Sequence, residues 1–139
     1  MADTIHVDIV SAEGEIFAGE ASMVFVPGSQ GELGIYPRHA PLLTTLKPGV
    51  VRVQTEDHDE QMFYVGGGML EIQPHLVTVL ADTAARARDL DEAAAVAAKK
   101  RAEDAMRERT AKVDLAEAET ELLRAIAQLR AIEQLRKKH

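Results

Sequence analysis

The chain has 139 residues, 46% hydrophobic and 28% charged, which suits one domain or a small domain with an appendage. It has no cysteine, which excludes disulfides, thiolate metal sites and cysteine nucleophiles. Its net charge of −7 argues against nucleic acid as a partner. We find neither a leader peptide at the start nor an apolar run near the roughly 18 residues of a membrane span, so we expect a soluble, intracellular chain.

The charge is distributed unevenly along the chain. Residues 1–84 carry three basic and twelve acidic side chains, a net charge of −9, and they contain all nine glycines and all five prolines. Residues 85–139 carry thirteen basic and eleven acidic side chains, a net charge of +2. The sequence therefore predicts two domains, 1–84 and 85–139, with a boundary after Ala84.

The first domain is predicted to be rich in β-strands. Its apolar or alternating runs are typical of half-buried strands, and turns containing glycine or proline separate them. The runs are Ile5–Ile9, Met23–Val26, Val50–Gln54, Met62–Val65, Leu70–Gln73 and Leu76–Leu80. Short strands at this spacing favour an antiparallel sandwich or barrel.

Two glycine-containing segments of this domain each allow two interpretations. Gly66–Gly68 predicts a bulge or a sharp bend between strands, and the alternative is the close approach of a ligand or a partner backbone. Gly31–Leu43 has many apolar residues for a loop. It either folds down over the core or presents Tyr36, Arg38 and His39 to a protein partner.

No pattern in the sequence predicts catalysis or metal binding. The histidines are scattered, without the His-x-His or His-Glu-x-x-His spacing of metal sites. The acidic segment 57–59 around His58 is predicted to be a solvated hairpin tip. No nucleophile–base arrangement or carboxylate pair stands out, so we expect no catalytic residue and no metal ligand.

The second domain is predicted to be helical. Asp89 with Glu92 three residues later predicts the N-terminus of a first helix, and Asp114 with Glu117 repeats the pattern for a second. In the second helix, apolar residues recur at steps of three and four, which is a heptad seam. The seam consists of Leu115, Ala118, Leu122, Ala125, Leu129 and Ile132, and Leu123, Ile126 and Leu135 widen it. Such a stripe requires a partner, either the first helix or another protein.

The joint between the two helices leaves the shape of this domain open. Met106–Val113 contains neither glycine nor proline, so it could bend into a hairpin or continue as one long helix. If the two states are close in free energy, the domain is a switch. The basic end of the chain at 136–139 suits either the helix dipole or an acidic protein surface.

Five stretches of the chain match motifs of one known family. They are VSAEGEIFAG (Val10–Gly19), GELGIYP-x-HAPLL (Gly31–Leu43), KPG (Lys47–Gly49), YVGGGMLEIQPHLVTVLADTA (Tyr64–Ala84) and DLDEA (Asp89–Ala93). The chain therefore resembles the epsilon-subunit family of bacterial F-type ATP synthases over nearly its whole length. Two alternatives are an adaptor that homo-oligomerises through the heptads and a small-molecule-binding barrel or enzyme, but the sequence lacks the clustered ionisable groups that the latter needs.

The resemblance implies an α+β fold in two parts, an N-terminal antiparallel β-sandwich of about ten strands followed by a C-terminal α-helical hairpin. It implies a non-catalytic rotor subunit of the central stalk, which couples c-ring rotation to ATP synthesis and restrains ATP hydrolysis through mobile C-terminal helices. The implied partners are the gamma subunit, the c-ring and, when the helices are extended, the beta and alpha subunits. The implied location is peripheral, at the cytoplasmic face of the bacterial inner membrane, and the isolated chain would be a monomer.

The resemblance also implies two sets of contact residues. The c-ring and gamma would be contacted by Glu32, Leu33, Gly34, Tyr36, Arg38 and His39. The regulatory contacts of the second helix would be made by Leu122, Arg124, Ile126, Leu129, Arg130 and Arg136. Where the family usually has Pro-Gly-His, this chain has Arg38 in the middle position, which costs roughly 1 kcal/mol if the backbone has a positive φ there.

The family's ATP-binding motif, Ile/Leu-Asp-x-x-Arg-Ala, is incomplete in this chain. Leu90 and Asp91 match it, and Arg101 matches a basic position that contributes in some members, but Ala94 stands where the motif has arginine. A guanidinium is the group best suited to bind phosphate. We therefore expect weak or no ATP binding and no other cofactor.

Overall fold

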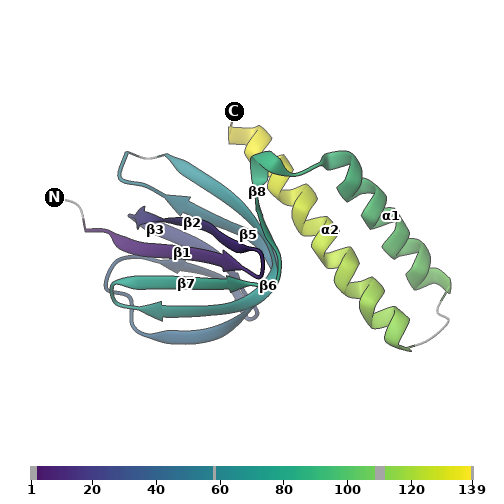
Figure 1. Ribbon diagram of the computed structural model, residues 1–139, viewed down its shortest axis with the longest axis horizontal. Coiled ribbons are helices and arrows are strands. Elements are labelled where there is room, and N and C mark those ends of the chain that lie inside the picture. Colours follow the sequence, from purple (N-terminus) through teal and green to yellow (C-terminus); the bar gives the residue numbers. More distant parts are fainter. Residues whose placement is uncertain (1–2, 58, 109–111, 139) are drawn as a thin grey trace.

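The computed structural model describes residues 3–57, 59–108 and 112–138. These residues form a β-sandwich followed by two long helices (Figure 1). The strands are β1 (Ile5–Ser11), β2 (Gly14–Ala21), β3 (Met23–Gly28), β4 (Gly31–Ile35), β5 (Leu42–Gln54), β6 (Glu60–Gln73), β7 (Leu76–Ala81) and β8 (Ala84–Arg86). The helices are the short 3-10 helix η1 (Ala87–Asp89), α1 (Glu92–Glu108) and α2 (Lys112–Lys138).

The strands form one hydrogen-bonded sheet that folds over into two layers. The order along the sheet is β2-β1-β7-β6-β5-β3-β4, and β8 pairs with β6 off this path. The first layer combines β2, β1 and β7 with the second half of β6 and the first half of β5. The second layer combines β4 and β3 with the other halves of β5 and β6 and with β8.

Glycines make the corner at which β5 and β6 pass from one layer to the other. In β6 the core side chains are Phe63 and Val65 before the corner and Leu70 and Ile72 after it, so the inward-facing positions change from odd to even numbers. Gly67 and Gly68 have φ values of 100° and 141°, which favour glycine. The predicted bend at Gly66–Gly68 therefore lies inside one long strand.

The core of the sandwich lies between the two layers and is entirely apolar. It contains Val and Ile side chains from β1, β3 and β7, and Phe63 is the largest fully buried side chain. The Phe63 ring is 5.3 Å from the Phe17 ring between centroids. This alternation of inward apolar residues is what the sequence pattern predicted for these strands.

The two helices form a hairpin on one outer side of the sandwich, with α2 between the sheet and α1 (Figure 1). One face of α2 packs on the second layer through Ala127 and Ala131. They meet Val50, Met62 and Tyr64, which are the outward-facing residues of β5 and β6. The opposite face of α2 carries the predicted heptad seam, and α1 covers it with small residues.

The strand predictions need four corrections. The described residues contain eight strands rather than about ten, because β5 and β6 each continue through both layers. The pairing of β1 with β7 is parallel, so the sandwich is not wholly antiparallel. β2 was not predicted. The segment Gly31–Leu43, predicted as a loop, contains β4 and the start of β5.

The predicted helix starts were also wrong, by two residues for α1 and by three for α2. Asp91, not Asp89, caps α1, because its Oδ1 accepts a hydrogen bond from the Ala94 amide at 3.1 Å. α2 begins at Lys112, which places Asp114 inside the helix. The joint predicted over Met106–Val113 includes 109–111, which lie outside the described residues, as does His58. The boundary predicted after Ala84 falls at the first residue of β8.

Candidate partner-binding surfaces

The loop after β4 forms a small exposed platform at the edge of the sandwich. Tyr36 is 58% exposed, and its ring lies against the His39 ring at 5.7 Å. The loop is tied down by two backbone hydrogen bonds, from the His39 amide to the Tyr36 carbonyl at 3.2 Å and from the Arg38 amide to the Pro74 carbonyl at 2.9 Å. Tyr36 and Arg38 are therefore presented outward on a fixed turn.

The other predicted contact residues on this edge differ in their accessibility. Glu32 is exposed, and its Oε1 is 3.3 Å from an Arg52 Nη2. Leu33 instead packs against the sandwich core. Gly34 lies close under Met23, because a Cβ at this position would be 3.0 Å from the Met23 Cε. Glu32, Tyr36 and Arg38 are thus exposed at the surface, whereas Leu33 stabilises the fold by packing against the core.

Arg38 adopts a backbone conformation that favours glycine. Its φ is 67°, and it is the one non-glycine residue with a positive φ in the described part of the chain. A left-handed conformation costs an L-residue about 1–2 kcal/mol. Its ion pair with Asp3, at 3.7 Å between two largely exposed side chains, offsets little of this strain.

We expect Arg38→Gly to stabilise the chain by roughly 0.5–1 kcal/mol, since the relief of strain exceeds the entropic cost of glycine. Chemical denaturation of the full chain measures this change. Arg38→Ala is the matched control, because it removes the ion pair with Asp3 but keeps the strained φ. If Arg38→Gly is no more stable than Arg38→Ala, the backbone at this position is not strained.

The outer face of the first layer carries an apolar strip that the sequence analysis missed. Thr45, Met69, Leu80 and Val10 are paired in succession across β5, β6, β7 and β1, so their side chains share this face. Met69 is 37% exposed and Leu80 52%. Leu43, one position further along the same side of β5, is 65% exposed. The available signal was the apolar residues at outward positions of strands whose inward positions were already apolar.

An acidic row runs beside this strip on the same face. His6 lies between two carboxylates, with its Nδ1 2.7 Å from Glu20 and its Nε2 2.8 Å from Asp8. The hydrogen bond with Glu20, followed by that with Asp8, raises the pKa of His6 above its usual 6.5. The same contact with His6 lowers the pKa of Glu20. The face is therefore apolar at one end and charged at the other, as protein interfaces often are.

Arg124 fixes the middle of α2 to the corner of the sandwich. Its Nε donates a 3.1 Å hydrogen bond to the Gly66 carbonyl, and its Nη2 lies 4.0 Å from Asp82. A Cβ at Gly66 would be 2.2 Å from the Thr83 Oγ1 and 3.1 Å from the Arg124 Nε. The predicted bend is therefore confirmed, and Gly66 also lets Arg124 of the same chain come close, whereas the approach of a ligand or a partner backbone stays a prediction.

Two further contacts fix the end of α2. Arg136 donates hydrogen bonds to both carboxylate oxygens of Glu92, at the start of α1. Lys138 donates to the Glu60 carbonyl and lies 3.7 Å from Asp59. In this docked arrangement α2 is tied to both the sandwich and α1.

The predicted regulatory residues of α2 are largely occupied inside the molecule. Leu122 and Leu129 lie on the seam that faces α1 and are partly buried, as is Ile126. Arg124 and Arg136 bind Gly66 and Glu92, and only Arg130 lacks a hydrogen bond or ion pair within the described residues. Contact of these residues with another subunit would require α2 to leave the sandwich.

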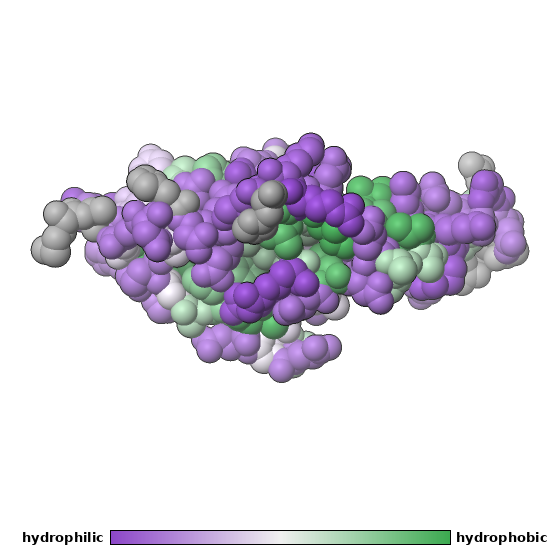
Figure 2. Space-filling view, turned by 90° about the horizontal axis from the view of Figure 1, so that it is seen from above, coloured by the Kyte–Doolittle hydropathy of each residue, from purple (hydrophilic) through white to green (hydrophobic). Residues whose placement is uncertain are grey.

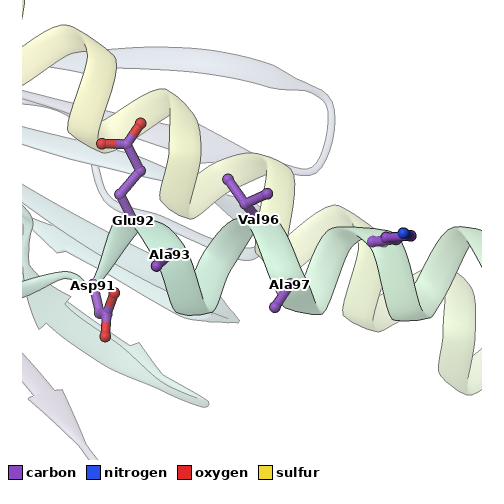
Figure 3. A pocket seen from close by; sticks show the side chains of 6 residues that line it. Asp91, Glu92, Ala93, Val96 and Ala97 are labelled. Carbon is purple, nitrogen blue, oxygen red and sulfur yellow. The ribbon is translucent and has the colours of Figure 1, made fainter.

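The residues of the incomplete ATP motif do not converge on one site. Leu90 packs against the cluster beneath α2, and Asp91 is used as the cap of α1. Arg101 is exposed and ten residues further along, about 15 Å up the helix. A shallow pocket does lie here, lined by Asp91, Glu92, Ala93, Val96, Ala97 and Lys100. Figure 3 shows that its two carboxylates, Asp91 and Glu92, point to opposite sides of α1.

The exposed side of α1 adds an apolar patch to the helical part of the molecule. Val96 is 52% exposed, and Ala93 and Ala97 beside it are also exposed. Figure 2 shows such apolar side chains among hydrophilic ones over the helical end. Within the described residues, no group of His, Asp and Glu side chains could hold a metal ion, and no helix is long and apolar enough to span a membrane.

Two family models match the chain in succession. The ATP synthase, Delta/Epsilon chain, beta-sandwich domain matches residues 4–87, and the ATP synthase, Delta/Epsilon chain, long alpha-helix domain matches residues 88–133. The chain is similar to the ATP synthase epsilon chain of Nitrosococcus oceani, with 62% identity over 138 residues and 99% of each chain covered. It is 60% identical to that of Alkalilimnicola ehrlichii over 97% of this chain and 96% of the relative.

Solved structures show the same fold at low sequence identity. A chain in the cryo-EM structure of the Euglena gracilis mitochondrial ATP synthase aligns with a TM-score of 0.83 and 16% identity, covering 93% of this chain and 81% of that one. A chain in the Tetrahymena thermophila mitochondrial ATP synthase central stalk and c-ring aligns with a TM-score of 0.62 and 11% identity, covering 94% and 97%.

Proposed function

Because the chain belongs to the ATP synthase delta/epsilon family, we propose that it is a non-catalytic subunit of the central stalk of a proton-translocating F-type ATP synthase. In this role it couples c-ring rotation to ATP synthesis and restrains ATP hydrolysis through its C-terminal helices. The sandwich holds the rotor, and α2 is the movable part. The family's two domains, found here in the same order over residues 4–133, support the assignment.

The observation that carries the regulatory part of this proposal is the way α2 is docked. The buried residues of α2 in its contact with the sandwich are two alanines, Ala127 and Ala131, which bury little apolar area each, and the partly buried Leu135 packs beside them. The remaining contacts are a few polar ones at the helix surface, which contribute modestly. A helix held in this way can leave the sandwich without unfolding the separate core between the two layers.

We propose that the gamma subunit binds the uncovered outer face of the first layer. Neither α1 nor α2 covers this face (Figure 1), and Met69, Leu80 and Leu43 make it apolar. The c-ring contact is proposed for the neighbouring edge with Glu32, Tyr36 and Arg38, where a fixed turn presents polar and aromatic groups. Alpha and beta subunits would be reached only by an undocked α2.

We expect Leu80→Glu to abolish or strongly weaken binding to the central stalk, because it places a charge in the middle of the apolar strip. Co-purification of the chain with the gamma subunit measures the effect, with a loss of roughly tenfold or more in affinity expected. Leu123→Glu is the matched control, since Leu123 on α2 is 54% exposed and Leu80 is 52% exposed. If Leu80→Glu and Leu123→Glu bind the gamma subunit equally well, the outer face of the first layer is not the surface that binds gamma.

We place the subunit at the cytoplasmic face of the bacterial inner membrane, held there through its partners in the complex. The isolated chain is proposed to be a monomer. Its heptad seam, which could otherwise pair two chains, is already covered by α1.

We propose that the chain binds ATP weakly or not at all. Asp91 is committed to capping α1, and Ala94 offers no cation one turn away. Titration calorimetry of the full chain with ATP is expected to show no binding below the millimolar range. Ala94→Arg, on the exposed side of α1, is expected to strengthen binding by roughly tenfold, since a guanidinium–phosphate pair contributes about 1.5–3 kcal/mol. Tight binding by the unaltered chain would contradict the proposal.

A further inference from the structure

We propose that a pocket between the edge of the sandwich and α2 binds a phosphate ion and thereby holds α2 in its docked position. The pocket has a volume of about 240 Å³ and is lined by β3, β4 and β5 on one side and α2 on the other. Its polar lining residues are Glu32, Lys47, Arg52, Arg130 and Gln134. This phosphate site is separate from the function proposed above, and phosphate binding there does not depend on that function.

The charge of the pocket is opposite to that of the domain that forms it. Residues 1–84 contain only three basic side chains against twelve acidic ones, yet two of the three, Lys47 and Arg52, line this pocket. Arg130 faces them from α2. Three cations therefore surround the space with Glu32 as the one lining carboxylate. An even distribution of the three basic residues over this acidic domain would not place two of them in one pocket.

Two of these cations have no partner of their own in the part of the chain that the structure describes. Neither Lys47 nor Arg130 makes a hydrogen bond or ion pair within the described residues. Arg52 differs, because it is held by Glu32 at 3.3 Å and Glu60 at 3.6 Å and lies over the Phe25 ring at 4.2 Å. Arg52 is thus shared between two carboxylates and adds little positive charge to the pocket, while Lys47 and Arg130 remain available to an anion.

Gln134 provides an unused polar group at the same place. Its Oε1 is buried and has no hydrogen-bond partner among the described residues. Buried side-chain oxygens are nearly always paired, and because this oxygen is closed off from solvent, the Gln134 amide must turn toward the pocket for a bound ligand to supply the missing partner. Near neutral pH inorganic phosphate carries a P–OH group, which donates a hydrogen bond, and P–O⁻ oxygens, which accept hydrogen bonds from Lys47 and Arg130. Sulfate lacks the donor, so the site should prefer phosphate.

The size of the pocket favours free phosphate over a nucleotide. Sites for larger organic ligands usually occupy about 300–1,000 Å³, whereas 240 Å³ holds a small ion with a few waters. A phosphate in this position touches β5 through Lys47 and α2 through Arg130. Because it binds only where the two surfaces meet, its binding stabilises the docked state by linkage.

The test is a titration of the isotope-labelled full chain with inorganic phosphate, followed by amide NMR at constant ionic strength and pH 7. Saturable shifts are expected at Lys47, Val50, Arg130 and Gln134, with a dissociation constant of about 1 mM. Lys47→Gln and Arg130→Gln should each weaken binding roughly tenfold. Lys100→Gln, an exposed lysine on α1, is the matched control and should change nothing.

Three results would overturn the proposal. One is an amide chemical shift that grows linearly with the phosphate concentration without saturation. Another is a loss of phosphate binding in Lys100→Gln equal to that in Lys47→Gln and Arg130→Gln. The third is an equal response to ADP at the same amides, which would assign the site to a nucleotide. Gln134→Met isolates the amide: we expect it to remove the preference for phosphate over sulfate, and an unchanged preference would refute the role of Gln134. None of these measurements uses the assembled enzyme, so they are independent of the proposed function.

Discussion

Deleting α2 after Glu108 is expected to raise the rate of ATP hydrolysis by the assembled enzyme several-fold, while the chain stays bound to the stalk. The deletion removes the helix proposed to reach the alpha and beta subunits, together with its basic residues Arg130, Arg136, Lys137 and Lys138. It leaves the sandwich core intact, because that core contains no residue of α2. The outer face of the first layer is likewise unchanged.

The measurement is steady-state hydrolysis by enzyme rebuilt with the full or the shortened chain, with the amount of bound chain determined in the same sample. Equal binding and unchanged hydrolysis would contradict the restraint. Loss of the shortened chain from the complex would instead show that α2 serves assembly. Leu123→Glu in the full chain is a useful comparison, since it alters an exposed residue of α2 that no seam buries.

The strands that were predicted from the sequence are those in which apolar and polar residues alternate strongly along the chain. β1 and β7 bury every second residue completely, and this pattern was visible in the sequence. β2 and β4 escaped prediction because they lie at the two ends of the sheet order and bury few residues. Their sequences, rich in glycine and glutamate, resemble loops because an edge strand needs less apolar surface.

The helix predictions show a related difference between the two faces of α2. The heptad seam toward α1 contains leucine and isoleucine, so its period was evident. The face toward the sandwich is made mainly of Ala127 and Ala131, with Leu135 beside them, and alanine carries little hydrophobic signal, so this face was not predicted. A helix buried on two opposite sides also lacks the single apolar stripe that sequence analysis looks for.

The candidate sites also differ in how far the sequence could predict them. The loop with Tyr36 and Arg38 is a single segment, and its composition pointed to it. The apolar strip and the phosphate pocket draw residues from several strands or from both domains, so they exist only once the register is known. The need for glycine at position 66 likewise depends on the fold, because a Cβ there would meet the Thr83 and Tyr64 hydroxyls and Arg124, which is 58 positions away.

Ala131→Glu is expected to release α2 from the sandwich. Ala131 is fully buried in the cluster with Val50, Met62 and Tyr64, and none of these carries a positive charge to pair with a carboxylate. Burying an unpaired charge costs several kcal/mol, which exceeds what two alanines, the partly buried Leu135 and a few surface contacts supply. The sandwich should remain folded, because its core is a separate cluster.

The distance between spin labels on Gln73, in the sandwich, and Glu133, on α2, measures the release. We expect one narrow distance distribution in the unaltered chain and a clearly broader one in Ala131→Glu. Ala116→Glu is the matched control, because Ala116 is an exposed alanine of the same helix and the same charge there meets water. Should Ala131→Glu keep the narrow distribution, the docked state is held by more than the apolar contact around Ala127 and Ala131, and the view of α2 as the movable part of the molecule would have to be abandoned.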